Sequence, residues 1–237
     1  MDVRRYPPLD FDRLTVETIR AVESYTLTTP ERIAALCQAV RYVAANSIDG
    51  AIVECGVWRG GSMMAAARTL LEVGDTARDL YLFDTFDGMV APGEFDRRSD
   101  GRAADDILAT EDRANPHSGW ARVPSHEVRL ALRSVGYPET KCHFIEGPVE
   151  RTIPDHAPTR IAILRLDTDW YESTKHEMSH LYPRISDRGV LLIDDYGAWQ
   201  GARKAVDEYL AGEAEPLFLN RIDNTGRIAV VQRERPC

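Results

Sequence analysis

Short, almost uninterrupted apolar runs recur along the chain, and segments with helical periodicity separate them. Apolar positions that repeat every three or four residues predict helices, as between residues 30 and 43. The apolar runs predict five buried strands, at residues 51–56, 80–84, 142–147, 161–167 and 189–195. Strands that are apolar on both faces and alternate with helices are typical of a parallel sheet covered on both sides. The pattern therefore predicts one α/β domain over residues 1–237.

Three segments depart from this alternation. Residues 1–47 hold helical patterns before the first strand and predict an N-terminal helical cap. Residues 90–125 are rich in charged and small residues, and long irregular segments inside compact domains are usually functional, so we expect an insertion or lid there. Near the end, residues 217–219 and 228–231 predict a closing antiparallel pair of strands.

Composition excludes several classes of protein. The chain has 237 residues, and 29 basic against 38 acidic residues give a net charge of -9, which disfavours nucleic-acid and anionic-lipid partners. No apolar run approaches the roughly 18 residues of a membrane helix. The cysteines are far apart, which predicts neither a zinc site nor a disulfide scaffold but free thiols in the cytoplasm. They are Cys37, Cys55, Cys142 and Cys237.

Acidic residues gather where the predicted strands end. In open α/β sheets, ligands bind outside the carboxyl ends of the strands, so these residues are candidates for a site. Capping of the following helix would account for any one of them, but hardly for all. They are Glu54, Asp84, Glu146, Asp167, Asp194 and Asp195.

The first strand runs into a turn with glycines at positions 56, 60 and 61. This spacing matches neither the G-x-G-x-x-G of dinucleotide enzymes nor a P-loop, and no lysine follows. Glycines there allow close backbone approach, and the helix that follows offers unpaired N–H groups. Asp84 ends the next strand, where an acid commonly binds both hydroxyls of a ribose. We expect a nucleoside ligand that also carries an amino-acid group.

A second group of acids consists of Asp167 and Asp169 after the fourth strand and Asp194 and Asp195 after the fifth. Several carboxylates that converge from neighbouring strands repel one another unless a cation lies among them. A hard divalent cation with oxygen ligands, preferably Mg²⁺, meets that need. The alternative is a helix cap at Asp167 or Asp169 with a solvated Asp195.

Taken together, these segments resemble the macrocin O-methyltransferase family, which methylates sugar hydroxyls of macrolide and related antibiotics with S-adenosylmethionine. The matching pieces run in the family's order over about residues 28 to 231. They are E-x-G-V-W-R-G-G at residues 54–61, D-T-F-D-G at 84–88, L-R-L-D-T-D-x-Y-x-S-T at 164–174, Y-P-R at 182–184 and I-D-D-Y at 193–196.

The resemblance implies a class I (Rossmann-like) methyltransferase fold, S-adenosylmethionine and Mg²⁺. It implies that Glu54 and the glycine turn hold the amino-acid end of the cofactor, that Asp84 holds its ribose, and that Asp167, Asp194 and Asp195 bind the metal. The expected acceptor is a small hydroxylated molecule, either a glycoside or a phenol. Assembly of the chain into a homodimer is left as an open alternative. The full set of expected cofactor-binding residues is Thr28, Glu54, Gly56, Trp58, Arg59, Gly60, Gly61, Ser62, Asp84, Thr85 and Gly147.

Asp167 is the candidate general base, since it would lie beside both the cation and the acceptor. His143, His176 and His180 are rivals for that role, although the last two share one helical face and suit a packing role better. Two other functions stay open: a catechol-type metal-dependent O-methyltransferase, and a non-catalytic protein that binds adenosylmethionine. An NAD-dependent oxidoreductase is disfavoured by the glycine spacing.

Overall fold

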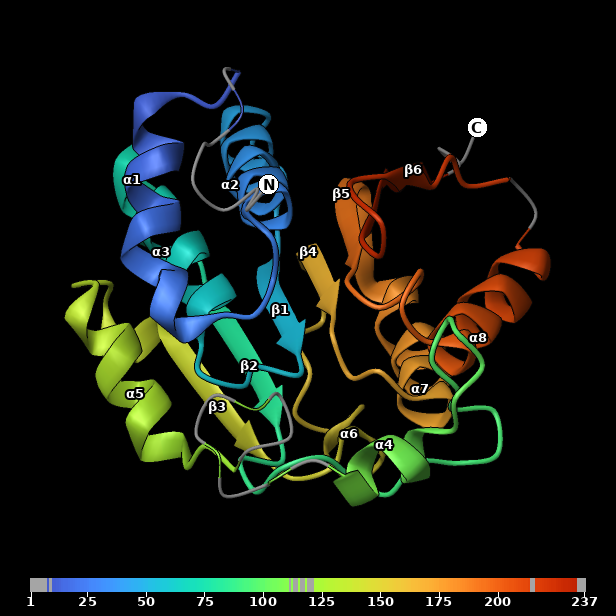
Figure 1. Cartoon of the computed structure of the whole chain (residues 1–237). Helices are drawn as coiled ribbons and strands as arrows, with labels where there is room; N and C mark the ends of the chain where they lie inside the picture. Colours follow the sequence, from blue (N-terminus) through green and yellow to red (C-terminus); the bar gives the residue numbers. More distant parts are fainter. Residues whose placement is uncertain are drawn as a thin grey trace.

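The computed structural model describes residues 8, 10–110, 112, 115, 118, 122–213 and 216–233. In these residues a seven-stranded sheet has the order β3-β2-β1-β4-β5-β7-β6 (Figure 1). Strands β1 to β5 are parallel, and β7 and β6 are antiparallel to their neighbours. The strands are β1 Ala51–Cys55, β2 Leu80–Asp84, β3 Cys142–Glu146, β4 Ile161–Leu166, β5 Ile185–Ile193, β6 Asn220–Arg221 and β7 Arg227–Val230.

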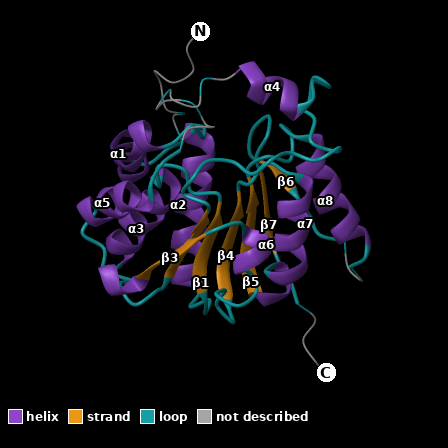
Figure 2. Cartoon of the chain, turned by 90° about the horizontal axis from the view of Figure 1, so that it is seen from below, coloured by secondary structure: helices purple, strands orange, loops and turns teal. Residues whose placement is uncertain are grey.

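Helices cover both faces of the sheet, with α1, α2, α3 and α5 on one face and α6, α7 and α8 on the other (Figure 2). They are α1 Arg13–Val22, α2 Pro30–Ala45, α3 Gly61–Val73, α4 Ala104–Thr110, α5 Ser125–Ser134, α6 Val149–Thr152, α7 Tyr171–His180 and α8 Gln200–Ala211. Short 3₁₀ turns lie at Glu23–Tyr25, Glu139–Lys141 and Tyr182–Arg184. None of the described helices combines the length and apolarity that a bilayer crossing needs.

The central strands are wholly buried, as their apolar sequences predict. Every residue of β1 and β4 is buried, and alternate side chains enter the two helical layers, Ile52 on the α2 and α3 side and Val53 on the α7 side. The predicted start of α2 is confirmed, because Thr29 caps the helix and Pro30 occupies its first turn. The mostly parallel sheet with antiparallel C-terminal strands agrees with the predicted fold class.

The predicted strand at residues 217–219 is wrong. The strand that pairs with β7 is β6, which begins at Asn220, one residue after the predicted strand ends, with Asn220 opposite Ile228. Phe218 is 84% exposed. The turn sets this register. Asp223 accepts hydrogen bonds from the backbone N–H groups of Thr225 and Gly226, and this closes the turn that places Arg221 opposite Arg227.

Much of the described part of the predicted lid is docked on the fold. Asp96 is 3% exposed and accepts hydrogen bonds from the backbone N–H of Gly93 (2.6 Å) and of Tyr171 (2.8 Å). The indole of Trp170 donates to the carbonyl of Val90 over 3.1 Å. The stretch from residue 90 to about 104 is therefore tied to the beginning of α7. Eight residues of the expected lid, at 111, 113, 114, 116, 117 and 119–121, lie outside the described part of the chain.

Candidate active site

A cavity of about 280 Å³ lies at the carboxyl ends of the parallel strands. It sits where the strand order reverses between β1 and β4, the usual ligand position in such sheets. Most of the residues expected from the sequence line it, namely Thr28, Gly56, Trp58, Gly61, Ser62, Asp84, Thr85, Gly147, Asp167, Asp194 and Asp195. Glu54, Arg59 and Gly60 do not, so direct contact between these three and a ligand stays a prediction.

The glycines of the turn at residues 56–61 permit close packing of the protein on itself. Gly56 has φ +82°, and a Cβ there would lie 2.0 Å from the carbonyl oxygen of Asp167. A Cβ on Gly61 would lie 2.6 Å from the carbonyl oxygen of Tyr25. The first contact joins the end of β1 to the end of β4. The second lets residues 25–28, here called the N-terminal strap, lie across the start of α3.

Asp84 connects the turns after β1 and β2. Its Oδ2 accepts hydrogen bonds from the backbone N–H of Val57 (2.6 Å) and Trp58 (3.0 Å), and its Oδ1 accepts one from Phe86 (2.7 Å). Three backbone dipoles therefore stabilise its charge. The carboxylate lines the cavity while it holds the walls together.

Arg165 lies buried in the sheet and contacts three carboxylates. Its Nη1 donates to Glu54 Oε1 (2.7 Å) and Asp167 Oδ2 (2.6 Å), and its Nη2 donates to Asp194 Oδ1. Burial raises the pKa of Glu54 to about 7, although Arg165 opposes that shift. Glu54 thus lies behind the cavity wall as part of the charge network.

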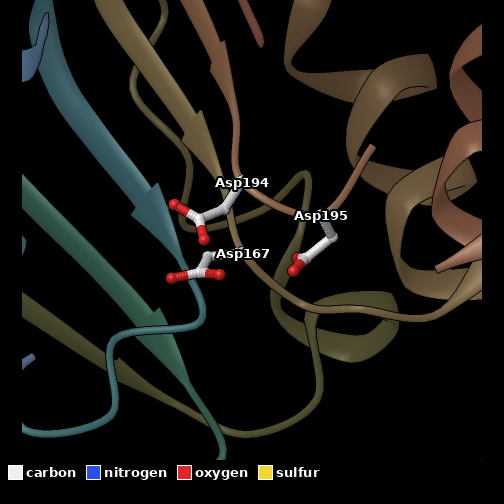
Figure 3. A group of neighbouring side chains, drawn as sticks. All are labelled: Asp167, Asp194 and Asp195. Atoms are coloured by element: carbon white, nitrogen blue, oxygen red, sulfur yellow. The ribbon is translucent and has the colours of Figure 1, made fainter. Parts of the chain in front are cut away.

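Asp167, Asp194 and Asp195, here called the aspartate cluster, converge from the ends of β4 and β5 (Figure 3). One oxygen from each lies within 4.8 Å of the others. Burial raises the pKa of Asp167 and of Asp195 well above the ordinary range, and repulsion from the neighbouring carboxylates adds to it. Only hard oxygen donors are present, and their charges repel, so the cluster fits a hard divalent cation such as Mg²⁺.

The three histidines considered as alternative bases do not line the cavity. His143 pairs with Asp79 over 2.8 Å. His176 contacts the carbonyl of Ile153 over 2.9 Å, and its ring lies 4.4 Å from that of His180. Asp167 does line the cavity, as do Asp169 and Asp195, so its role as the general base stays a prediction.

Several residues that line the cavity were not predicted from the sequence. The N-terminal strap contributes Leu27, which is 61% exposed, and Met89 and Val90 contribute an apolar wall. Trp170 also lines the cavity and packs edge-to-face on Trp199 with 4.9 Å between ring centres. Trp170 stands at an unspecified position of the motif at residues 164–174, next to Asp169, and that position was its only signal. Leu27, Met89 and Val90 carry no local signal for a site.

Comparison with known proteins decides the family. A model of the macrocin-O-methyltransferase family matches residues 4–230. The chain belongs to this family. The expectation of an S-adenosylmethionine-dependent O-methyltransferase is therefore confirmed at the level of the enzyme class.

Two curated relatives are about one-third identical to the chain over the residues that match. One is 8-demethyl-8-(2,3-dimethoxy-alpha-L-rhamnosyl)-tetracenomycin-C 4'-O-methyltransferase of Streptomyces olivaceus, 36% identical over 205 residues, which cover 86% of this chain and 74% of the relative. Another is demethyldecarbamoylnovobiocin O-methyltransferase of Streptomyces niveus, 33% identical over 189 residues, which cover 79% of this chain and 68% of the relative.

Solved structures confirm the predicted methyltransferase fold. The O-methyltransferase NovP matches with a TM-score of 0.75 and 31% identity, over 88% of this chain and 83% of that protein. The calicheamicin methyltransferase CalS11 matches with a TM-score of 0.65 at 19% identity, over 92% of this chain and 91% of that protein, which supports the fold alone.

Proposed function

We propose that this enzyme transfers a methyl group from S-adenosylmethionine to a hydroxyl of a sugar or of another small natural product in secondary metabolism, with Mg²⁺ bound at the aspartate cluster. The relatives named for a rhamnosyl tetracenomycin and for a novobiocin precursor support such an acceptor. The observation that carries the metal part is the approach of three carboxylates to within 4.8 Å beside the cavity. The cytoplasm as location and a homodimer as assembly remain predictions.

The cofactor fits the half of the cavity formed by the turns after β1, β2 and β3. We expect the glycine turn and Thr28 to hold the amino-acid end, and Asp84 with Thr85 to hold the ribose. Gly147 follows β3 and lines the adjoining wall, which is suited to the base of a nucleoside. Glu54 and Arg165 act from behind this wall by setting its charge.

The acceptor and the metal belong to the other half, at the aspartate cluster. When bound, adenosylmethionine supplies an electrophilic methyl group, and Mg²⁺ supplies a positive charge that favours the ionised form of the acceptor hydroxyl. The acid side chains hold the cation through their oxygens. Arg165 holds Asp167 by its Oδ2, so Oδ1 is the oxygen that would serve both the cation and the proton of the acceptor hydroxyl.

The apolar wall limits water in the half that holds the acceptor. Trp170 is 2% exposed and is fixed by its hydrogen bond to the Val90 carbonyl. This hydrogen bond ties the insertion to the loop that follows Asp167. A low-dielectric wall also strengthens the electrostatic interactions inside the site.

A methylation assay on a panel of acceptors tests this proposal. Glycosides, among them rhamnosides, and catechol are incubated with adenosylmethionine in the presence of Mg²⁺ or EDTA, and mass spectrometry detects the gain of one methyl group. We expect methylation of a glycoside that EDTA stops and added Mg²⁺ restores. Undiminished transfer in EDTA would show that the acids are structural. Transfer to catechol alone would favour the phenol-directed alternative, and binding of adenosylmethionine without transfer would favour a binding protein.

A further inference from the structure

Asp194 differs from the other members of the aspartate cluster, because arginine donates to both of its carboxylate oxygens. Arg165 donates through Nη2 to Oδ1, and Arg32 donates through Nη1 to Oδ2. The hydroxyl of Thr28 adds a 3.0 Å hydrogen bond to Oδ1. The side chains of Arg32 and Asp194 are only 14% and 9% exposed. Solvent and salt therefore screen this ion pair less than they would a surface pair.

The C-terminal hairpin holds Arg32 in place. Its Nε donates to Asp223 Oδ2 over 2.9 Å, and Asp223 Oδ1 accepts from two backbone N–H groups of the same turn. A Cβ on Gly226 would lie 2.7 Å from Cδ of Arg32. The turn therefore leaves room for the arginine stem only because a glycine stands there. Residues near both ends of the chain thus combine to aim one guanidinium at Asp194.

The charges around the cluster do not balance through Arg165 alone. Its guanidinium contacts the carboxylates of Glu54, Asp167 and Asp194, and Asp195 adds a fourth carboxylate to the group. Arg32 brings a second guanidinium, but it also contacts the carboxylate of Asp223, so the acids still outnumber the arginines when all are ionised. This excess of negative charge favours a cation at the cluster.

We propose that Arg32 is a resident counter-cation for Asp194, a positioning residue that neutralises the aspartate cluster and weakens its attraction for the divalent cation. The inference rests on the proposed Mg²⁺ site. Without Arg32, Arg165 and Thr28 would still hold Asp194 by Oδ1, so the carboxylate would keep its place while the site became more negative. Coulomb's law then favours tighter binding of any other cation. Arg32 thereby keeps the metal exchangeable and lets the cluster fold without it.

The test replaces Arg32 in the full-length chain and measures Mg²⁺ binding directly. Isothermal titration should show that Arg32→Met binds Mg²⁺ on the order of tenfold more tightly than the wild type. In EDTA, Arg32→Met should melt at a lower temperature, and Mg²⁺ should raise its Tm by more than it raises that of the wild type. Arg32→Lys keeps the positive charge and should restore an affinity near that of the wild type.

Arg41 offers a matched control on the same helix. It bridges Asp12 and Glu72 at 3.0 and 2.9 Å and is 24% exposed, away from the cavity. Arg41→Met should lower the Tm without changing the affinity for Mg²⁺. If the wild type binds Mg²⁺ and Arg32→Met binds it equally or more weakly, the counter-cation role is overturned while the metal site stands. If neither protein binds Mg²⁺, the metal part of the proposed function fails, and this inference fails with it.

Discussion

The two halves of the cavity stabilise their acids in different ways. In the cofactor half, Asp84 is surrounded by three backbone N–H groups from the turns after β1 and β2. In the metal half, Asp194 depends on two arginine side chains, one of them 162 positions away in the chain. Local turns therefore build the first half, and long side chains from distant elements build the second.

Because of this difference, a single side-chain substitution can alter the electrostatic environment of the acids in the metal half more easily than in the cofactor half. Backbone N–H groups stay whatever side chains surround them, so the environment of Asp84 is robust. A guanidinium group, in contrast, is removed by one substitution. The buried carboxylates that it had paired with then remain without a compensating charge, which is strongly destabilising. The metal half is thus open to adjustment of charge, pKa and cation affinity, whereas the cofactor half responds to substitution mainly through loss of hydrogen bonds.

The largest expected effect is in the metal half. Asp167→Asn removes the candidate base and one metal charge, so turnover should fall by about 10²- to 10⁴-fold or more, while the affinity for adenosylmethionine stays nearly constant. Single-turnover assays and isothermal titration measure the two quantities. Asp79→Asn, which changes an acid that pairs with His143 away from the cavity, is the control. Retained turnover in Asp167→Asn would remove this residue from the chemistry.

The burial of Glu54 should make the free energy of unfolding depend on pH. Burial raises its pKa from 4.5 to about 7, so the folded protein holds this proton more tightly than the unfolded chain does. The stabilisation is complete below pH 4.5 and is lost as the pH rises through about 7, by up to about 3 kcal/mol. Urea unfolding at a series of pH values in EDTA should show this loss in the wild type and a flatter curve in Glu54→Gln. Parallel curves would contradict it.

Asp84→Ala probes the half built by the backbone. It removes the acceptor of three N–H groups as well as the expected ribose contact, so cofactor affinity and the free energy of unfolding should each fall by about 1–3 kcal/mol. Titration calorimetry and urea unfolding give the two values. A loss of stability with unchanged affinity would show that Asp84 supports the turns without touching the ribose.

The smallest effect is expected at Asp96, which also accepts from backbone N–H groups. Asp96→Ala leaves the N–H groups of Gly93 and Tyr171 without this acceptor, and loss of a comparable helix cap costs about 1 kcal/mol. Burial of the Asp96 carboxylate is itself unfavourable, as its raised pKa indicates. Removing the carboxylate therefore offsets part of the lost stability. Thermal unfolding checks the loss, with the exposed Asp106 on α4 replaced by alanine as the control. An unchanged Tm would mean that other contacts dock the insertion.

The parts of the molecule that could be predicted are those in which neighbouring residues carry the pattern. The five parallel strands and the start of α2 follow from apolar runs and from Thr29-Pro30. The convergence of Asp167 with Asp194 and Asp195 also followed, because the carboxyl ends of parallel strands meet at one edge. The position of β6 could not be predicted, since the hydrogen bonds of Asp223 in the turn decide that register.

The alternation of the elements, the acids at one edge of the sheet and the family of the chain can all be derived from the amino-acid order alone. Apolar periodicity, turn residues and contiguous motifs express these features over short stretches. Only the tertiary structure decided that Arg165 connects Glu54 to the aspartate cluster and that Arg32 reaches Asp194. Such contacts depend on where separate elements place their side chains in space, and no local pattern of residues records that distance.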